Sequence, residues 1–592
     1  MSKKSGPRDR GEQNTQRRAS GDALFRVGGC GGRSGARDSA GYRVRRQIGY
    51  KAGYAADKLL LSALLASLCL FVLWPMVCIF LKSLWDGENL SYAAYTSVWE
   101  QYRTNLWNSV FVGVCSALLC TVFSTAAALF LATRRGAARL ICLALLLITM
   151  VSPPFVSSLA YIQLYGRRGW ITYRLLGLRW DPYNCWGVIL MQSLSFVPLN
   201  ALFLNGILSK LDSDSIRAAR DLGASPGAIL KDIVLPLMRP GILVALLLSF
   251  VRSLADFGTP VIIGGRFSTI ASEIYLQLVG YSNLEKASAM NMFLMAPSIG
   301  AFFLYRRLMK RSDMLTEGIR GRQEPLSLSL KRCGSPGIAA AVVSMVFFLM
   351  MALQYGCIFL SGFLKSTRGV SSFTTRYLEQ LVRYDLSTMG RSVAYALVVS
   401  LGGTLFAMLF SYYMERRRVP GRNLFDCLVT LPYMLPGTCF GIGYILAFNK
   451  APLKLTGTAV IVIANMLFKQ LPTATKICSA TLTQVPRAQE KAVRDLGGGQ
   501  FAVLRSVILP GLRPAFLSCF VYNFSSSMTT AGAILFLIDP GRKLAVFKLF
   551  DAVYTGEYAL ASLIASSIIL VVLAVEGLAY IITWKAGKRR VS

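Results

Sequence analysis

Long apolar segments alternate with short polar segments along most of the chain. Each apolar segment approaches or exceeds about 18 residues, the length at which a helix can cross the hydrocarbon core of a bilayer. The pattern therefore predicts an all-α polytopic membrane protein. Twelve transmembrane helices are expected, near residues 58–82, 106–132, 140–165, 185–207, 241–264, 288–306, 336–362, 391–414, 423–448, 457–482, 514–538 and 560–584.

The polar segments that follow the fourth and tenth predicted spans are near copies of each other. Residues 216–240 and 490–514 are identical at 11 of 25 positions without a gap, at an offset of 274 residues. Each half of the chain has six predicted spans, so both halves begin on the same side of the membrane. This predicts two parallel six-helix repeats, 57–310 and 336–592, joined by a cytoplasmic linker at 311–335.

Positive charge suggests how the spans are oriented. The net charge is +35 over 592 residues, and Lys and Arg gather in the tail, after spans two, six and eight, and at the C-terminal end. The positive-inside rule then places both termini in the cytoplasm, although the basic segments 166–184 and 365–390 would be external and depart from the rule. Residues 1–56 are predicted to be a disordered basic tail near anionic membrane lipid. A nucleic-acid site is the alternative explanation of the charge, and we expect no nucleic-acid partner.

The composition limits the chemistry that the chain can perform alone. It has no histidine and no C-x-x-C pair, and most of its 13 cysteines lie inside apolar segments. The commonest general base and the usual metal-binding spacings are therefore missing. We expect no catalytic site, no bound metal and no cofactor.

The repeated segment has the signals of two short helices joined by a turn. Gly223 and Gly497 suit the left-handed residue that ends a first helix. In the first copy Ser225 is a candidate N-cap and Pro226 suits the first position of the next helix. That helix is predicted to end just before Pro236, and its copy before Pro510. Small residues on one face suit docking of another protein, whereas an amphipathic loop lying on the membrane is the alternative.

This segment resembles the cytoplasmic EAA loop of the permease subunits of binding-protein-dependent ABC importers. The family pattern is E-A-A, three residues, Gly, nine residues and I-x-L-P. The first copy matches at Ala218, Ala219, Gly223, Ile233, Leu235 and Pro236, and the second at Ala492, Gly497, Leu509 and Pro510, with Val493 and Val507 as conservative departures. Arg217 and Lys491 stand where the family has Glu, and Asp221 and Asp495 are alternative anions for the contact.

The resemblance implies an inner-membrane permease without a nucleotide site of its own, coupled to two copies of a cytoplasmic ABC ATPase and fed by an extracytoplasmic solute-binding protein. The implied ATPase-coupling residues are Arg217, Ala218, Ala219, Asp221, Leu222, Gly223, Leu235 and Pro236 in the first copy, and Lys491, Ala492, Asp495, Leu496, Gly497, Leu509 and Pro510 in the second. The fusion of two permease halves in one chain resembles the ferric-iron branch of the family, and the segments 249–265 and 430–444 are similar to spans of that branch. Ferric iron is the implied substrate, with thiamine, a polyamine or a phosphonate as alternatives.

Polar residues within the predicted spans are candidates for the substrate pathway, because charges in a membrane are costly. Asp256 lies in predicted span five with Arg252 one turn earlier, and a structural ion pair is the alternative role. The candidate pathway residues are Ser253, Asp256 and Gly258 in the first half, and their counterparts Ser527, Thr530 and Gly532 in the second. Lys469 and Glu576 are weaker candidates. Pro153, Pro154, Pro432 and Pro436 interrupt the third span of each half.

A secondary transporter with two six-span halves is the alternative of another class. Such a transporter needs its own coupling acids or histidines deep in the membrane. Only Asp256 and Glu576 are obvious candidates here. It also has no need for two matching loops on one side, so the ABC permease is favoured.

Overall fold

The computed structural model describes residues 57–86, 89–179, 181–209, 213–317, 333–367, 370–417 and 419–588. The predicted tail and most of the predicted linker, 318–332, lie outside these ranges. The described part is overwhelmingly helical, as predicted, and its strands form two short antiparallel hairpins. These are β1 (Trp85–Asp86) with β2 (Asn89–Leu90), and β3 (Leu364–Thr367) with β4 (Val370–Phe373).

The helices of the first half follow one another as α2 (Trp74–Leu84), α3 (Ala93–Thr133), α4 (Ala137–Val151), α5 (Phe155–Tyr165), α6 (Cys185–Leu208), α7 (Ser213–Asp221), α8 (Pro226–Ala228), α9 (Leu235–Ala255), α10 (Gly258–Ile263), α11 (Ile270–Val279) and α12 (Leu284–Glu317). Those of the second half are α13 (Gly334–Ser361), α14 (Arg376–Gln380), α15 (Leu386–Arg416), α16 (Arg422–Thr430), α17 (Gly437–Phe448), α18 (Ala459–Leu482), α19 (Arg487–Asp495), α20 (Gln500–Val503), α21 (Leu509–Gly511), α22 (Arg513–Thr529), α23 (Ala545–Tyr554) and α24 (Tyr558–Lys588).

Eight described helices are long and apolar enough to cross a membrane, or up to eleven if each of three bent helix pairs counts as one span. Eleven of the twelve predicted spans overlap with these helices. The remaining one, 457–482, is α18, a helix of 24 residues that carries Lys469 and Lys476 and is therefore less apolar. The predicted linker is shorter than expected, because α12 continues to Glu317.

The third predicted span of each half is not straight. The chain bends by 111° between α4 and α5, at Pro153 and Pro154, and by 112° between α16 and α17, where Pro432 and Pro436 lie. Proline cannot donate a backbone hydrogen bond and its ring clashes with the preceding turn. These prolines therefore end one helix and start another, and no continuous helix forms over 140–165 or 423–448.

The first helix of each half reaches across to the other half. The segment α2 packs against α17, and α13 packs against α3 and α5. In the turn before α2, the ring of Phe71 stacks on Phe468 of α18 at 4.9 Å between ring centroids. The boundaries 57–310 and 336–592 thus divide the sequence into repeats, but the first helices join the two repeats in space.

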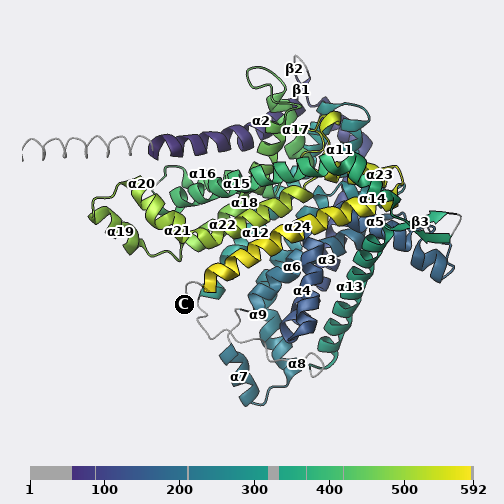
Figure 1. Cartoon of the computed structure of the whole chain (residues 1–592), viewed down its shortest axis with the longest axis horizontal. Coiled ribbons are helices and arrows are strands. Elements are labelled where there is room, and N and C mark those ends of the chain that lie inside the picture. The colour runs from purple at the N-terminus through teal and green to yellow at the C-terminus, as the bar shows by residue number, and fades with distance from the viewer. Residues whose placement is uncertain are drawn as a thin grey trace, which may run out of the picture.

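The rest of each half is packed in the same way. In the first half α3 packs against α6 and α9, and in the second α15 packs against α18 and α22. Buried polar contacts hold both sets together: Asn200 donates to Ser249 at 2.6 Å, and Asn523 donates to Thr404 at 3.2 Å. Figure 1 shows α19 at the left and α7 at the bottom, at the tips of two diverging bundles, whereas α11 and α23 lie toward the upper right.

Candidate functional site

The two repeated loops contain the predicted helix-ending turn. Gly223 and Gly497 have φ angles of +83° and +80°, in the left-handed region that glycine adopts without a steric penalty. The backbone N–H of Ala224 donates to the carbonyl of Ala219 at 2.9 Å, and that of Gly498 donates to Val493 at 2.8 Å. These bonds satisfy carbonyls at the helix ends. The predicted turn is confirmed in both loops.

The helix after the turn does not end where the sequence predicts. Ser225 caps it as expected, accepting from the N–H of Ala228 at 3.2 Å. A wider π-helical turn, Ile229–Val234, then precedes Pro236, and the helical run continues from 226 to 255 as α9. The π turn accommodates the missing proline N–H. In the second loop the run continues past Pro510 but bends by 69° before α22.

The loop residues predicted to couple to an ATPase are mostly exposed at the tips of the bundles. Leu222 and Leu496 are 88% and 87% exposed. The other exposed members are Arg217, Ala218, Asp221, Gly223, Lys491, Ala492, Asp495 and Gly497, whereas Ala219, Leu235, Pro236, Leu509 and Pro510 are half-buried. The helical run 226–255 joins the first loop to a membrane helix without a break, whereas the run after the second loop bends by 69° before α22.

The two loops are anchored differently. In the first, Ile216 is buried in an apolar cluster with residues of the π-helical turn Ile229–Val234, of α9 and of the chain before α13. The equivalent position in the second loop is Glu490, which is also buried and forms an ion pair with Arg416 at 3.2 Å. Both side chains of this pair are less than a tenth exposed.

Arg416 also holds the chain that leads into the second loop. Its Nη2 donates to the carbonyls of Leu482 at 2.7 Å and Val485 at 2.6 Å, just after α18. One guanidinium at the end of α15 thus joins α15, α18 and α19. The pair was not predicted from the sequence, where Glu490 is one of two acidic residues in a helix that also carries three basic ones.

A cavity of about 690 Å³ lies between the two halves. Asp256 and Thr530, equivalent by the repeat offset, both line it, as do Gly258 and Gly532. Asp256 was predicted to lie within a span, but it is the C-cap of α9 at the break before α10. Thr530 is likewise the C-cap of α22. Both halves therefore interrupt the same helix at the cavity.

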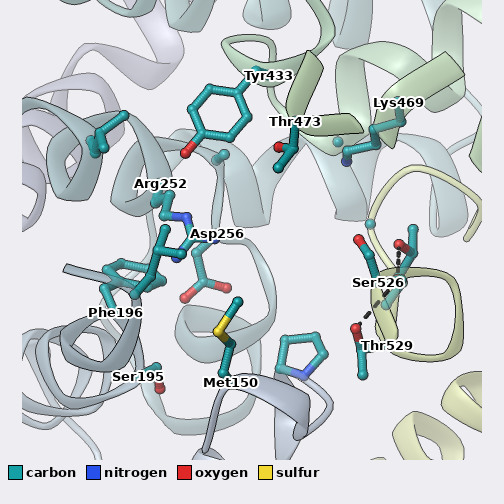
Figure 2. A pocket seen from close by; sticks show the side chains of 18 of the residues that line it. Met150, Ser195, Phe196, Arg252, Asp256, Tyr433, Lys469, Thr473, Ser526 and Thr529 are labelled. Carbon is teal, nitrogen blue, oxygen red and sulfur yellow. Dashed lines mark hydrogen bonds between the residues drawn. The ribbon is translucent and has the colours of Figure 1, made fainter. Parts of the chain in front are cut away.

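The Asp256 carboxylate is held by neighbours other than Arg252. Its Oδ2 accepts from Nε2 of Gln192 at 3.1 Å, and its Oδ1 accepts from the N–H of Thr259 at 3.2 Å. The possible ion pair with Arg252 is not formed, and the Arg252 guanidinium instead lies 5.9 Å from the ring centroid of Phe196. Figure 2 shows Arg252 and Asp256 among the residues of one cavity wall.

The other predicted pathway residues are two buried serines and two glycines that line the cavity. Ser253 donates to Gln192, and Ser527 exchanges hydrogen bonds with Gln470; both serines are buried and neither lines the cavity. A methyl group at Gly258 would clash with the ring of Phe155, and one at Gly532 would lie 3.2 Å from Phe257. These glycines allow aromatic rings to approach the backbone.

The second half lines its side of the cavity with hydroxyl groups and an ammonium group. Lys469 and Thr473 of α18 and Ser526 and Thr529 of α22 are visible in Figure 2. Thr473, Ser526 and Thr529 were missed by the sequence analysis, together with Tyr433 and Ser525. The available signal was the hydroxyl-rich run at 525–530 inside an apolar segment.

An aromatic cluster joins the two halves beside the cavity, toward the end where α11 and α23 lie. Phe155 and Phe257 line the cavity. Phe550 of α23 lies 4.8 Å from Phe155 and 5.9 Å from Tyr275 of α11, measured between ring centroids. In Figure 1 α11 and α23 are far from the loop helices α7 and α19, so Phe550 and Tyr275 lie on elements remote from the loops.

Few charged groups line the cavity. Within the described ranges, four lining side chains are charged at neutral pH when they have their ordinary pKa values: Arg252, Asp256, Lys469 and Glu576. Among the described residues there is no group of three or more His, Cys, Asp or Glu side chains that could hold a metal ion. A solute in the cavity would meet dispersed polar groups from both halves.

Comparison with known proteins gives a consistent picture. The family described as the inner membrane component of binding-protein-dependent transport systems matches residues 124–358 and 400–585. The ferric transport system permease protein FbpB of Actinobacillus pleuropneumoniae is 30% identical over 547 residues, covering 88% of this chain and 77% of the relative. A putative FbpB of Haemophilus influenzae is 30% identical, covering 81% and 78%. The thiamine permease ThiP of Escherichia coli is 22% identical, covering 83% and 91%.

Proposed function

The chain belongs to the family of inner membrane components of binding-protein-dependent transport systems, and we propose that its central cavity carries ferric iron across the membrane. It is a multi-pass permease of the ABC type. The observation that carries the proposal is the position of the cavity between two repeats, each with an exposed loop at the tip of its bundle and far from α11 and α23.

The exposed loops are the proposed contacts with the motor. Two loops of matching fold call for two copies of a cytoplasmic ATPase, one for each loop, with both chain termini on the same side. Closure of the ATPase pair would bring the loops together and open the opposite end to a solute-binding protein. The helical run from 226 to 255 supports this transmission, because it joins a loop to the cavity residue Asp256.

Ferric iron is proposed because two relatives of 30% identity that align with most of the chain are named as ferric transport permeases. Thiamine is the second candidate, supported by the more distant ThiP. The cavity can accommodate either cargo by size. The secondary transporter is disfavoured, because few acids lie in the membrane and the two loops would have no role.

The test is reconstitution of the chain with its ATPase and binding protein in proteoliposomes. We expect iron uptake that requires ATP and the binding protein, and an ATPase that co-purifies with the chain. Competition with unlabelled thiamine distinguishes the two substrates. Uptake without ATP, with no co-purifying ATPase, would contradict the proposal and support a secondary transporter.

The aromatic cluster gives a second prediction. Phe550→Ala removes the ring that bridges Phe155 and Tyr275, and deletes about 3–5 kcal/mol of packing free energy if the site does not collapse. We expect a faster ATP turnover in the absence of binding protein, because the closed state of the cavity is less stable. The measurement is ATPase rate with and without binding protein. The control is Phe359→Ala, which removes a partly buried ring of α13. Among the described residues this ring stacks on no other ring, so the ratio of the ATPase rates with and without binding protein should not change.

A further inference from the structure

Lys469 is an ammonium group on the cavity wall for which the structure supplies no counter-ion. It projects from the middle of α18 and lines the cavity. No carboxylate lies within 4.0 Å of its Nζ in the part of the chain that the structure describes. A charge at membrane depth is costly unless it is paired or functional. The cargo itself is a possible partner.

The ammonium group faces the start of a helix. A methyl group built on Gly437 would lie 2.7 Å from the Lys469 Nζ and 3.1 Å from the backbone nitrogen of Ala533. Gly437 is the first residue of α17, a helix of 12 residues whose N-cap, Pro436, makes no side-chain capping bond. The first N–H groups of a helix have no partner within the helix and favour anions. The Lys469 ammonium group therefore lies beside the start of α17.

Each repeat contributes one basic and one acidic side chain to the lining, Arg252 and Asp256 in the first and Lys469 and Glu576 in the second, at positions that are not equivalent. By the repeat offset Lys469 corresponds to Ser195, whose hydroxyl donates to the carbonyl of Met191, and Asp256 corresponds to Thr530. Each repeat thus has one charged position where the other has a hydroxyl. The first half supplies the carboxylate of Asp256 and the second supplies the ammonium group of Lys469, as Figure 2 shows.

This arrangement is poorly suited to a bare trivalent cation. Arg252 and Lys469 balance Asp256 and Glu576, so the four ionisable residues of the lining bring no net negative charge when all are ionised. A trivalent ion would need several anionic oxygen ligands in a medium of low dielectric constant. Those ligands would have to arrive with the ion.

We infer that Lys469 and the N-terminus of α17 form a subsite for an oxyanion, and that the cargo crosses as a metal ion ligated by that oxyanion. The oxyanion lies against Lys469 and the metal faces Asp256. This inference rests on the proposed function for the metal, whereas the anion subsite rests on the geometry around Lys469. No covalent step is involved, and the oxyanion travels with its charge unchanged.

The test uses the reconstituted importer with radiolabelled iron and radiolabelled phosphate. We expect both labels to enter together in the unmodified protein. Lys469→Met should lower uptake of both by about tenfold or more, because a charge-assisted hydrogen bond to the anion is lost. Lys469→Arg should restore part of the uptake. Lys476→Met is the matched control, since it removes an exposed ammonium group from the same helix and should leave uptake unchanged.

The outcomes separate the two proposals. If iron enters without phosphate and Lys469→Met has no effect, the subsite is wrong and the ferric permease stands. Phosphate uptake that is the same with and without iron, and that is lost in Lys469→Met, would support the subsite and contradict the ferric cargo. Equilibrium binding of radiolabelled phosphate to the purified chain, with and without ferric ion, tests the subsite without transport. Equal binding by the unmodified chain and Lys469→Met would overturn it.

Discussion

Proline in place of Gly223 will stop cargo uptake while the permease remains inserted in the membrane. Gly223 has a φ of +83°, and the proline ring fixes φ near −65°. The turn between α7 and α8 then cannot form, and Leu222 and the other exposed residues lose their positions. We expect uptake to fall by about tenfold or more, which corresponds to a loss of about 1.4 kcal/mol of docking free energy. Gly497→Pro should act in the same way on the second loop.

The matched control for this prediction is Gly457→Pro. Gly457 has a φ of +80°, and, as at Gly223, nothing lies within 4 Å of a methyl group built on it. Gly457 precedes α18 and is remote from both loops. Proline there is as incompatible with the backbone conformation as at Gly223, but the position has no proposed coupling role. Uptake and ATPase co-purification are measured for all three variants. Normal uptake in Gly223→Pro and Gly497→Pro would show that the loops do not couple to the motor.

The features that the sequence predicts correctly depend on short stretches of chain. Apolar segments of sufficient length predict membrane helices, and Gly223 and Gly497 predict the turns, because each follows from local backbone chemistry. The repeat offset places Asp256 and Thr530 at equivalent positions, and both line the cavity. Proline is the local signal that was misjudged: Pro236 was expected to end a helix, and a π-helical turn carries the helix past it.

The remaining features depend on contacts between distant residues. The packing of α2 against α17 and of α13 against α3 has no signature in the spacing of apolar residues, because every face of a membrane helix is apolar. The cavity lining also combines residues separated by hundreds of positions. Lys469 was a weak candidate in the sequence, and only its position beside Gly437 gives it a specific role.

The two repeats differ at some of the positions where function is expected. Ile216 and Glu490 are equivalent, yet one is held by apolar packing and the other by an ion pair. The cavity differs as well, because Asp256 and Lys469 stand where the other half has Thr530 and Ser195. Fusion of two halves in one chain fixes their stoichiometry, so each half is free to specialise while the helices keep a common fold.

Glu490→Ala will destabilise the permease more than a typical single substitution. It leaves Arg416 buried at the end of α15 without its carboxylate partner, and breaking a buried pair in this way costs about 3–5 kcal/mol. We expect a lower thermal unfolding midpoint in detergent and weaker co-purification of the ATPase, because α19 loses its anchor. Replacing Arg416 and Glu490 together by Met should recover much of the loss, since an apolar pair needs no compensation of charge.

The exposed ion pair between Arg167 and Asp181 is the control that separates the effect of burial from the effect of pairing. Its atoms are 2.8 Å apart, closer than in the buried pair, but its side chains are 69% and 55% exposed. Water and salt screen such a pair, so Asp181→Ala should leave the unfolding midpoint unchanged. If Asp181→Ala and Glu490→Ala lowered the thermal unfolding midpoint equally, the stabilisation by the Arg416–Glu490 pair would not depend on its burial. If Arg416→Met with Glu490→Met were no better than Glu490→Ala, the carbonyl contacts of Arg416 would be the main restraint on the second loop.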